Sequence, residues 1–262
     1  MNDSKERMFN MTKKQPYGTV LIKADQILNY LSKSNQPQRL YKIVEHTDLT
    51  NSTASKILNT LELIGYVKRD PESQEFSLGP SITRYANRSI EQMDIKKVAY
   101  PHLEKLRDHT TETVHFGVMD RDKIIYIEKL ESQNPVSLYS QVGKTVPLYC
   151  SAMGKSILAD QTDEEINRYL NENKLERKTE HTITSKSAFK EELKRVRNLG
   201  YAFDDAEHEL DIFCVGTSIT SNGHNYGALS VSVPKYRMTT QLLAMVIDEV
   251  KMCKENILAD LH

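Results

Sequence analysis

The segment from Thr50 to Asp70 constrains the fold of this chain most, because it joins a capped helix to a short basic strand. Its sequence is TNSTASKILNTLELIGYVKRD. Apolar residues recur at helical spacing and predict a helix that buries one stripe. They are Ala54, Ile57, Leu58, Leu61 and Ile64. Thr50 or Asn51 can cap the first turn, and Gly65 is typical of the residue that ends a helix.

The opposite face of this helix carries short hydrogen-bonding side chains and one cation, with no acidic residue before Glu62. This composition is typical of a helix that contacts base edges and phosphates in a DNA groove. The predicted DNA-contacting residues of the helix are Asn51, Ser52, Thr53, Ser55, Lys56, Asn59 and Thr60. A polar face that simply meets solvent has a similar composition, so the segment alone leaves both interpretations open.

The flanking patterns favour a winged helix. One helical pattern begins at Leu21 and ends before Pro37, and a second short one begins at Leu40. After the third helix, two strand-like runs flank the turn residues DPES at 70–73. We therefore predict a winged helix-turn-helix over 20–80, in which Lys68 and Arg69 on the wing contact DNA, preceded by a flexible arm over 1–19.

The charge distribution agrees with a DNA-facing first module. Residues 1–90 hold 13 Lys and Arg against 9 Asp and Glu, whereas the other 172 residues hold 22 against 27. A basic module joined to an acidic one fits a DNA-binding part and a part with another role. The asymmetry is modest, and it would also fit a protein that never meets DNA.

Cysteine usage and hydropathy exclude several classes of protein. Cys150, Cys214 and Cys253 form no CxxC pair, so we expect no zinc ribbon, disulfide framework, metal or cofactor. Such usage is typical of a reducing compartment. No apolar run reaches membrane-spanning length, and the N-terminus lacks a signal-peptide core. We expect a cytoplasmic protein without a membrane partner.

The rest of the chain predicts a second, α+β domain over 94–262, reached through a linker helix over 81–93. A second helix follows the linker helix, with Pro101 one turn inside it. Strand-like runs then follow in TVHFGVM, KIIYIEKL and PVSLYSQV. We expect a loop through Cys150, a helix from Ala152 capped by Ser151, and further helices at 163–173, 187–199 and 239–259. Two long strands joined at 221–224 complete an antiparallel sheet with flanking helices.

Three features of this domain predict a site for a small carboxylate with an oxygen substituent. A helix N-terminus near Ala152 favours an anion. Ser230 and Ser232 are two apart on a strand, so both side chains point to the same side. Asp204 can accept a hydrogen bond from a ligand hydroxyl. Alternatively, the two serines face solvent, Cys214 is a small core residue, and Asp204 only caps a turn.

Five segments resemble the IclR family of bacterial transcription regulators, from about Val20 to the C-terminus. In chain order they are NSTASKILNTLELIGYV, TETVHFGVMDRDKIIYIEKL, VGKTVPLYCSAMGKSILA, LGYAFDDAEHELDIFCVGTSI and GALSVSVP. The resemblance implies that the first domain binds double-stranded operator DNA as a homodimer. It also implies that the second is a GAF/PAS-like domain that binds a small-molecule effector and assembles dimers into tetramers.

The same resemblance implies an effector pocket. By position in the matching segments, its residues are Leu138, Val146, Ala152, Met153, Asp204, Ile212, Cys214, Ser230 and Ser232. The chain departs from the family pattern at two places. Tyr149 stands where many members have histidine, and Met153 is larger than the alanine often found there. The resemblance therefore does not name the effector.

We conclude from the sequence that the chain is a ligand-responsive DNA-binding regulator, a repressor or an activator, and not an enzyme. Two alternatives stay open. Cys150 precedes a predicted helix N-terminus, which lowers a thiol pKa, so the chain could be a cysteine-dependent enzyme with His208 as base. It could also be a ligand sensor that acts through protein contacts and retains a vestigial winged helix.

Overall fold

A computed structural model describes residues 17–91, 94–134 and 138–261. The chain forms two compact units that divide between Ser89 and Ile90. Most of the predicted flexible arm, residues 1–16, lies outside the described residues. Within the described ranges, no helix combines the length and the apolar composition that crossing a membrane requires.

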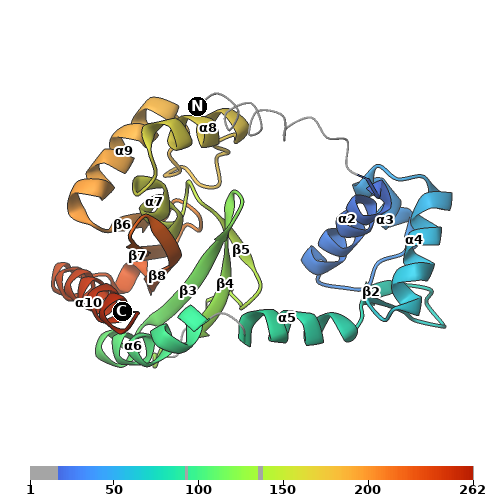
Figure 1. The fold of residues 1–262 in the computed structure, drawn as a ribbon, viewed down its shortest axis with the longest axis horizontal. Helices are drawn as coiled ribbons and strands as arrows, with labels where there is room; N and C mark the ends of the chain where they lie inside the picture. The colour runs from blue at the N-terminus through green and yellow to red at the C-terminus, as the bar shows by residue number, and fades with distance from the viewer. Residues whose placement is uncertain (1–16, 92–93, 135–137, 262) are drawn as a thin grey trace, which may run out of the picture. The chain divides into compact units, whose positions relative to one another are not determined.

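The first unit is the predicted winged helix-turn-helix (Figure 1). Its helices and strands are α2 (Thr19–Lys33), α3 (Leu40–Thr47), α4 (Asn51–Leu63), β1 (Val67–Arg69) and β2 (Phe76–Leu78), and α5 (Ser81–Glu91) follows. Ile27, Ile43 and Leu58 are fully buried, one from each of the first three helices. The three helices therefore share one apolar core, and the hairpin adds Val67 and Phe76 to it.

Local hydrogen bonds fix both ends of α4. The Thr50 hydroxyl accepts from the backbone N–H three residues later, at 3.2 Å. Gly65 adopts a φ of 77°, its N–H donates to the Glu62 carbonyl, and the Tyr66 N–H donates to the Leu61 carbonyl. This bond pair is the Schellman motif. It reverses the chain, so β1 begins directly after the helix.

The wing is attached to the helices through its second strand. Phe76 and Gln38, just before α3, exchange two backbone hydrogen bonds of 2.8 Å. At the tip, the Asp70 carboxylate accepts from the backbone N–H groups of Glu72 and Ser73, at 3.0 and 2.7 Å. These bonds close the predicted turn and lower the Asp70 pKa.

The second unit is an α+β domain built on one six-stranded antiparallel sheet, in the order β5-β4-β3-β8-β7-β6. Its strands are β3 (Thr113–Asp120), β4 (Lys123–Leu130), β5 (Thr145–Pro147), β6 (Ala202–Asp205), β7 (Ile212–Ser221) and β8 (His224–Pro234). Its helices are α6 (Asp94–Thr110), α7 (Ala152–Ala159), α8 (Asp163–Glu172), α9 (Lys186–Leu199), the 3-10 helix η2 (Lys235–Arg237) and α10 (Thr240–Asp260).

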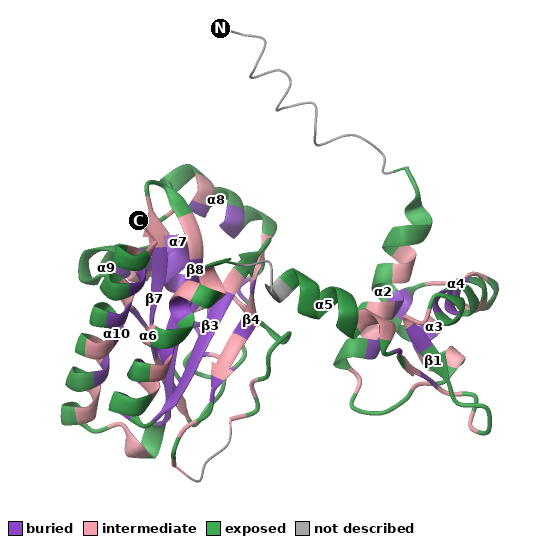
Figure 2. Cartoon of the chain, turned by 60° about the horizontal axis from the view of Figure 1, so that its bottom comes forward, coloured by how far each residue is buried: buried purple, intermediate pink, exposed green. Residues whose placement is uncertain are grey.

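Helices cover both faces of this sheet, giving three layers. Figure 1 shows α6 and α10 along one face, and α7, α8 and α9 on the other. Alternate strand residues therefore enter two separate cores: Val215 and Val231 pack toward α10, whereas Cys214 and Ala228 pack toward α7. The sheet and α7 are the most completely buried elements (Figure 2).

Four predictions about this domain were wrong in detail. Residues 135–137 lie outside the described residues, and the rest of PVSLYSQV forms no strand. The strand that pairs with β4 comes later, at Thr145–Pro147, in a segment predicted as loop. β6 is an additional strand, formed because 202–205 pairs with β7. Pro101 lies about two turns inside α6, not one, because that helix begins at Asp94.

Gly154 determines how closely α7 approaches the backbone of Leu148, which directly follows β5. All eight residues of α7 are buried. A Cβ atom on Gly154 would lie 2.3 Å from both the Cα and the carbonyl oxygen of Leu148. These are backbone atoms, so no side-chain rotation relieves the overlap. The glycine therefore permits a contact that no other residue permits.

We predict that Gly154→Ala destabilises the second unit by about 1–3 kcal/mol, as overpacking of a core does. Helix propensity alone predicts the opposite sign, a gain of up to about 1 kcal/mol. Chemical denaturation measures the difference. Asn167→Ala, on the exposed side of α8, is the control for the propensity gain alone. An unchanged or higher midpoint for Gly154→Ala would contradict the packing argument.

Candidate functional sites

The face of α4 opposite its core stripe is exposed and polar. Asn51, Ser52, Lys56, Asn59 and Thr60 are exposed, and the other two predicted DNA-contacting residues, Thr53 and Ser55, are half-buried. Some of these hydroxyls already bond within the helix. The Thr60 hydroxyl donates to the Lys56 carbonyl. The Thr50 hydroxyl donates to the hydroxyl of Thr53. The exposed amide and ammonium groups remain the main polar surface.

A hollow of about 510 Å³ lies between α4, the start of α3 and the wing. It is lined by Arg39, Leu40, Tyr41, Asn51, Ser55, Asn59, Arg69, Ser73, Gln74 and Phe76. Four of these were predicted from the sequence as DNA contacts: Asn51, Ser55, Asn59 and Arg69. The cation Arg39 and the polar Tyr41, Ser73 and Gln74 were missed, since the backbone pairing of Gln38 with Phe76 is a tertiary contact.

The two basic residues of the wing lie on different faces of the hairpin. Arg69 pairs in register with Phe76, and its guanidinium lies 5.3 Å from the centre of that ring. Lys68 pairs with Ser77 and does not line the hollow. Successive residues of a strand point to opposite faces, so only Arg69 faces α4.

In the second unit, a cavity of about 40 Å³ lies at the N-terminal end of α7. All nine residues predicted for the effector pocket line it: Leu138, Val146, Ala152, Met153, Asp204, Ile212, Cys214, Ser230 and Ser232. The structure therefore brings together residues from separate strands, loops and one helix. It adds six lining residues outside that predicted set, namely His115, Tyr126, Ser140, Ser151, His208 and Glu209.

The N-terminus of α7 is held against the sheet at the cavity wall. The Ser151 hydroxyl donates to the Pro147 carbonyl at 2.8 Å and accepts from the Gly154 N–H at 3.1 Å. A Cβ on Gly216 of β7 would lie 3.0 Å from the Ala152 Cβ, so helix and strand touch. The first-turn N–H groups of a helix carry a partial positive charge, which favours an anion here.

The paired serines of β8 lie inside the domain and not on its surface. Ser230 and Ser232 are 3% and 4% exposed, so the alternative of a solvent-facing strand was wrong. Cys214 pairs in register with Ser232, and its Sγ lies 3.2 Å from the serine Oγ. The thiol thus contacts both the core and the cavity.

Asp204 combines both roles considered from the sequence. Its Oδ1 accepts from the backbone N–H of Glu207 at 2.7 Å and of His208 at 3.3 Å, so it does cap a turn. It also lines the cavity. Burial, and then the nearby Glu207 carboxylate, raises the Asp204 pKa to about 7, although the two backbone bonds oppose this shift.

A buried ion-pair cluster lies beneath the cavity. Lys155, one turn into α7, is fully buried and forms ion pairs with Glu207 and, at 3.4 Å, with Glu192. Glu192 is paired in turn with Arg195 at 2.8 Å. A buried charge needs such partners. A lysine within the otherwise small and apolar run AMGKSILA was a signal that the sequence reasoning did not use.

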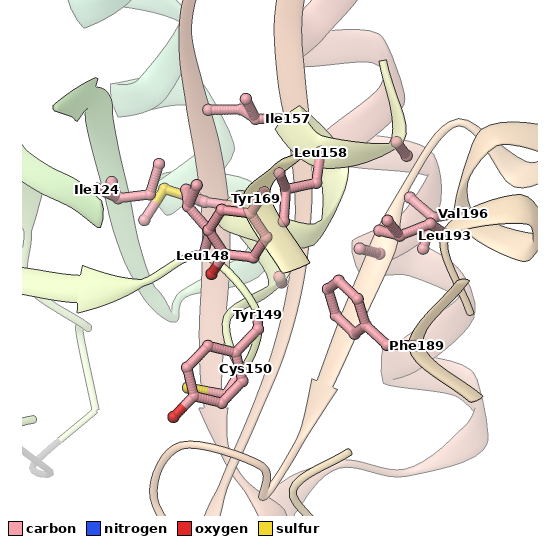
Figure 3. Close-up of a cluster of buried hydrophobic side chains, with 14 of the residues drawn as sticks. Ile124, Leu148, Tyr149, Cys150, Ile157, Leu158, Tyr169, Phe189, Leu193 and Val196 are labelled. Atoms are coloured by element: carbon pink, nitrogen blue, oxygen red, sulfur yellow. The ribbon is translucent and has the colours of Figure 1, made fainter. Parts of the chain in front are cut away.

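The structure removes the argument for Cys150 as a nucleophile. Cys150 is fully buried beside Tyr149, in the apolar cluster between α7 and α9 (Figure 3). Burial, and then the Asp204 carboxylate, raises its pKa to about 12. A reactive cysteine needs the opposite shift and access. In the part of the chain that the structure describes, no group of His, Cys, Asp and Glu side chains could hold a metal.

Two family profiles match the chain and together span most of it. Residues 20–71 match the IclR helix-turn-helix domain. Residues 87–259 match the bacterial transcriptional regulator IclR C-terminal domain. The profiles follow the order of the two units that the structure separates.

Individual relatives agree with these matches. The regulator KdgR of Escherichia coli is 33% identical over 196 residues, covering 74% of each chain. The repressor IclR of Escherichia coli is 28% identical over 238 residues, covering 88% of this chain and 87% of the repressor.

Among solved structures, IclR of Thermotoga maritima is 32% identical with a TM-score of 0.70, covering 94% of this chain and 99% of that one. An IclR homologue from Microbacterium hydrocarbonoxydans, complexed with 4-hydroxybenzoate, shares the fold at 22% identity with a TM-score of 0.76, covering 92% of this chain and 98% of its own. Together, the matched profiles, the winged helix and the α+β domain show that this chain belongs to the IclR family of helix-turn-helix transcriptional regulators, which carry an effector-binding C-terminal domain.

Proposed function

We propose that this regulator binds operator DNA through the exposed face of α4, with Arg69 of the wing contacting phosphate. The hollow that α4, Arg39 and Arg69 share supports this, because it joins groove-reading amides to two cations. The side chains that point along α4 into this hollow are Asn51, Ser55 and Asn59. We assign DNA binding to residues 20–80 and a linker to 81–93.

One such helix contacts too few base pairs for useful specificity in a genome, so we propose a symmetric homodimer on a palindromic operator. Pairs of dimers would form the tetramer that the family resemblance implies. We also propose that the protein acts in the bacterial cytoplasm, where operator DNA lies. The alternative, a sensor with a vestigial winged helix, predicts that the protein shows no salt-sensitive DNA binding.

We predict that Lys56→Ala and Arg69→Ala each weaken operator binding and lower the slope of log affinity against log salt by about 1, because each phosphate contact releases counterions. Asn59→Ala is expected to relax base preference instead. Fluorescence anisotropy over a salt series measures the first effect, and the same assay on operators with single base changes measures the second.

The matched control is Lys190→Ala, which removes one exposed positive charge from α9 in the other unit. It corrects for the change in net charge. Parent-like binding by Lys56→Ala and Arg69→Ala at every salt concentration would refute the DNA-contact assignment.

We propose that the cavity at the N-terminus of α7 binds the effector, and that the C-terminal domain over 94–262 transmits its presence. The observation that carries this is the convergence of nine residues from separate segments on one cavity. Its donors are serine hydroxyls and first-turn N–H groups, and its acceptors include the carboxyl group of Asp204. This set fits a carboxylate that also bears a hydroxyl or a hydrated carbonyl.

The size of the cavity limits the effector. A cavity of about 40 Å³ holds a ligand of about three to five non-hydrogen atoms, since one water needs about 10–15 Å³ measured in this way. We therefore propose a short-chain carboxylate. A ligand can change DNA affinity only by binding the DNA-competent and incompetent states unequally.

We predict that Ser230→Ala with Ser232→Ala leaves operator affinity intact and removes the effect of the effector on it, because the pocket loses two donors. Short-chain carboxylates, beginning with propionate and glycolate, would be screened by thermal shift and then added to the anisotropy assay. Parent-like ligand response of the double variant would place the effector elsewhere.

We also predict that binding of an anionic ligand weakens as pH rises through about 7. The raised pKa of Asp204 means that its carboxyl is protonated below this pH and charged above it, where it repels the ligand. Because the pKa of Asp204 is higher in the folded state, its protonation also stabilises the fold at low pH. This contribution to the free energy of unfolding is lost as pH rises through about 7. Titration of glycolate at pH 6 and 8 tests this, and Asp204→Asn is expected to abolish the difference. A pH-independent parent would contradict the assignment.

We infer no catalytic role for this chain. The buried Cys150, with its raised pKa, lacks the access that a nucleophile needs. The second proposed participant, His208, lines the cavity, and burial lowers its pKa. Fast labelling of Cys150 by iodoacetamide at neutral pH would count against this inference.

A further inference from the structure

His115 joins the floor of the cavity to a loop that lies over it. It is a buried residue of β3. Its Nδ1 lies 3.2 Å from the Ser232 Oγ on β8, and its Nε2 lies 2.6 Å from the Ser140 Oγ. Both serines line the cavity. One imidazole ring therefore bonds to two cavity residues at opposite ends.

Ser140 belongs to the loop Leu138–Lys144, whose backbone is held from β4. The Lys129 ammonium donates to the carbonyls of Leu138 and Ser140, at 2.9 and 2.8 Å. Its third partner is Glu131, at 2.8 Å. The backbone of the loop is thus fixed by Lys129, and its side-chain contact with the cavity wall is made through His115.

The His115 ring is neutral at physiological pH. Burial, and then the positive charge of Lys129, lowers its pKa to about 3. A neutral imidazole has one donor nitrogen and one acceptor nitrogen. The two serines consequently cannot both donate to the ring, and they cannot both accept from it.

Two arrangements of hydrogens satisfy the contacts. With the proton on Nδ1, the ring donates to Ser232, whose own hydrogen can then point into the cavity, and Ser140 donates to Nε2. With the proton on Nε2, the ring donates to Ser140, and Ser232 must donate to Nδ1, so its hydrogen turns away from the cavity. An anion that accepts from Ser232 is compatible with the first arrangement.

We propose that His115 is a specificity-determining residue that couples the charge of the bound effector to the loop Leu138–Lys144. A carboxylate selects the Nδ1–H form, in which Ser140 must donate to the ring, so the charge of the ligand sets the direction of the hydrogen bond that holds the loop. A ligand that donates to Ser232 selects the other form. This inference rests on the proposed role of the cavity as the effector site.

The coupling is tested first without ligand, by hydrogen exchange of the loop amides in the full-length protein. Ser140→Ala and Ser232→Ala are each expected to raise exchange of residues 138–144 by about fivefold, as loss of one hydrogen bond does. Because both substitutions act through the one His115 ring, the loop amides of the double variant are expected to exchange at most about fivefold faster than those of the parent protein. Lys144→Met is the matched control, since it removes the contact between Lys144 and the Tyr139 carbonyl in the same loop without touching His115.

A double variant whose exchange equals the product of the single effects would overturn the proposal, as would an unaltered loop in Ser232→Ala. In a His115→Asn background, which keeps a polar group near Ser232 and removes the one near Ser140, the dependence on Ser232 is expected to disappear. If His115→Asn fails to fold, the Ser140 and Ser232 comparison decides alone.

The ligand test compares propionate with propionamide by thermal shift. Ser140→Ala is expected to lose most of the preference for the anion, and Lys144→Met to keep it. If Ser230→Ala with Ser232→Ala abolishes the response but Ser140→Ala keeps the full preference, the coupling proposal fails and the effector site stands. If that double variant responds like the parent, the effector site itself fails.

Discussion

The close contact of α7 with the sheet is the constraint on which the second unit depends. Gly154 lets the helix meet the backbone at Leu148, and Gly216 lets it meet β7. The helix is buried from its first residue to its last, so its N-terminus faces protein and not water. A helix N-terminus in such surroundings interacts strongly with an anion, since little solvent screens it. Close packing thus creates both the core and the character of the cavity.

The same burial explains the charges around the cavity. Lys155 is tolerated in the core because Glu207 and Glu192 pair with it. Burial raises the pKa of Asp204, and the negative charge of Glu207 nearby raises it further because it opposes ionisation of a second carboxyl group. His115 stays neutral for the related reason that burial and Lys129 both oppose a positive ring. Burial therefore lowers the charge that two cavity residues carry near neutrality, because it keeps His115 neutral and raises the pKa of Asp204.

The DNA-binding unit depends on a different device, the tight reversal after α4. The left-handed Gly65 turns the chain directly into the wing, and the pairing of Phe76 with Gln38 fixes the wing against the start of α3. Arg69 consequently faces the same hollow as Asn51 and Asn59, although it is ten residues or more away in sequence. A rigid wing positions its cation without a further ordering cost on binding.

Local sequence signals determined much of this protein. Caps at Thr50 and Ser151, the stripe of α4 and the alternation of Ser230 and Ser232 are short-range patterns, and the structure has each of them. What tertiary structure decided involves partners far apart in the chain. The β5 strand formed at 145–147 because β4 pairs with it there. His115 contacts Ser140 and Ser232, and Lys155 pairs with Glu207. The spacing of these residues in the sequence does not predict either set of contacts. Periodicity reports one element at a time, whereas a cavity is made where several elements meet.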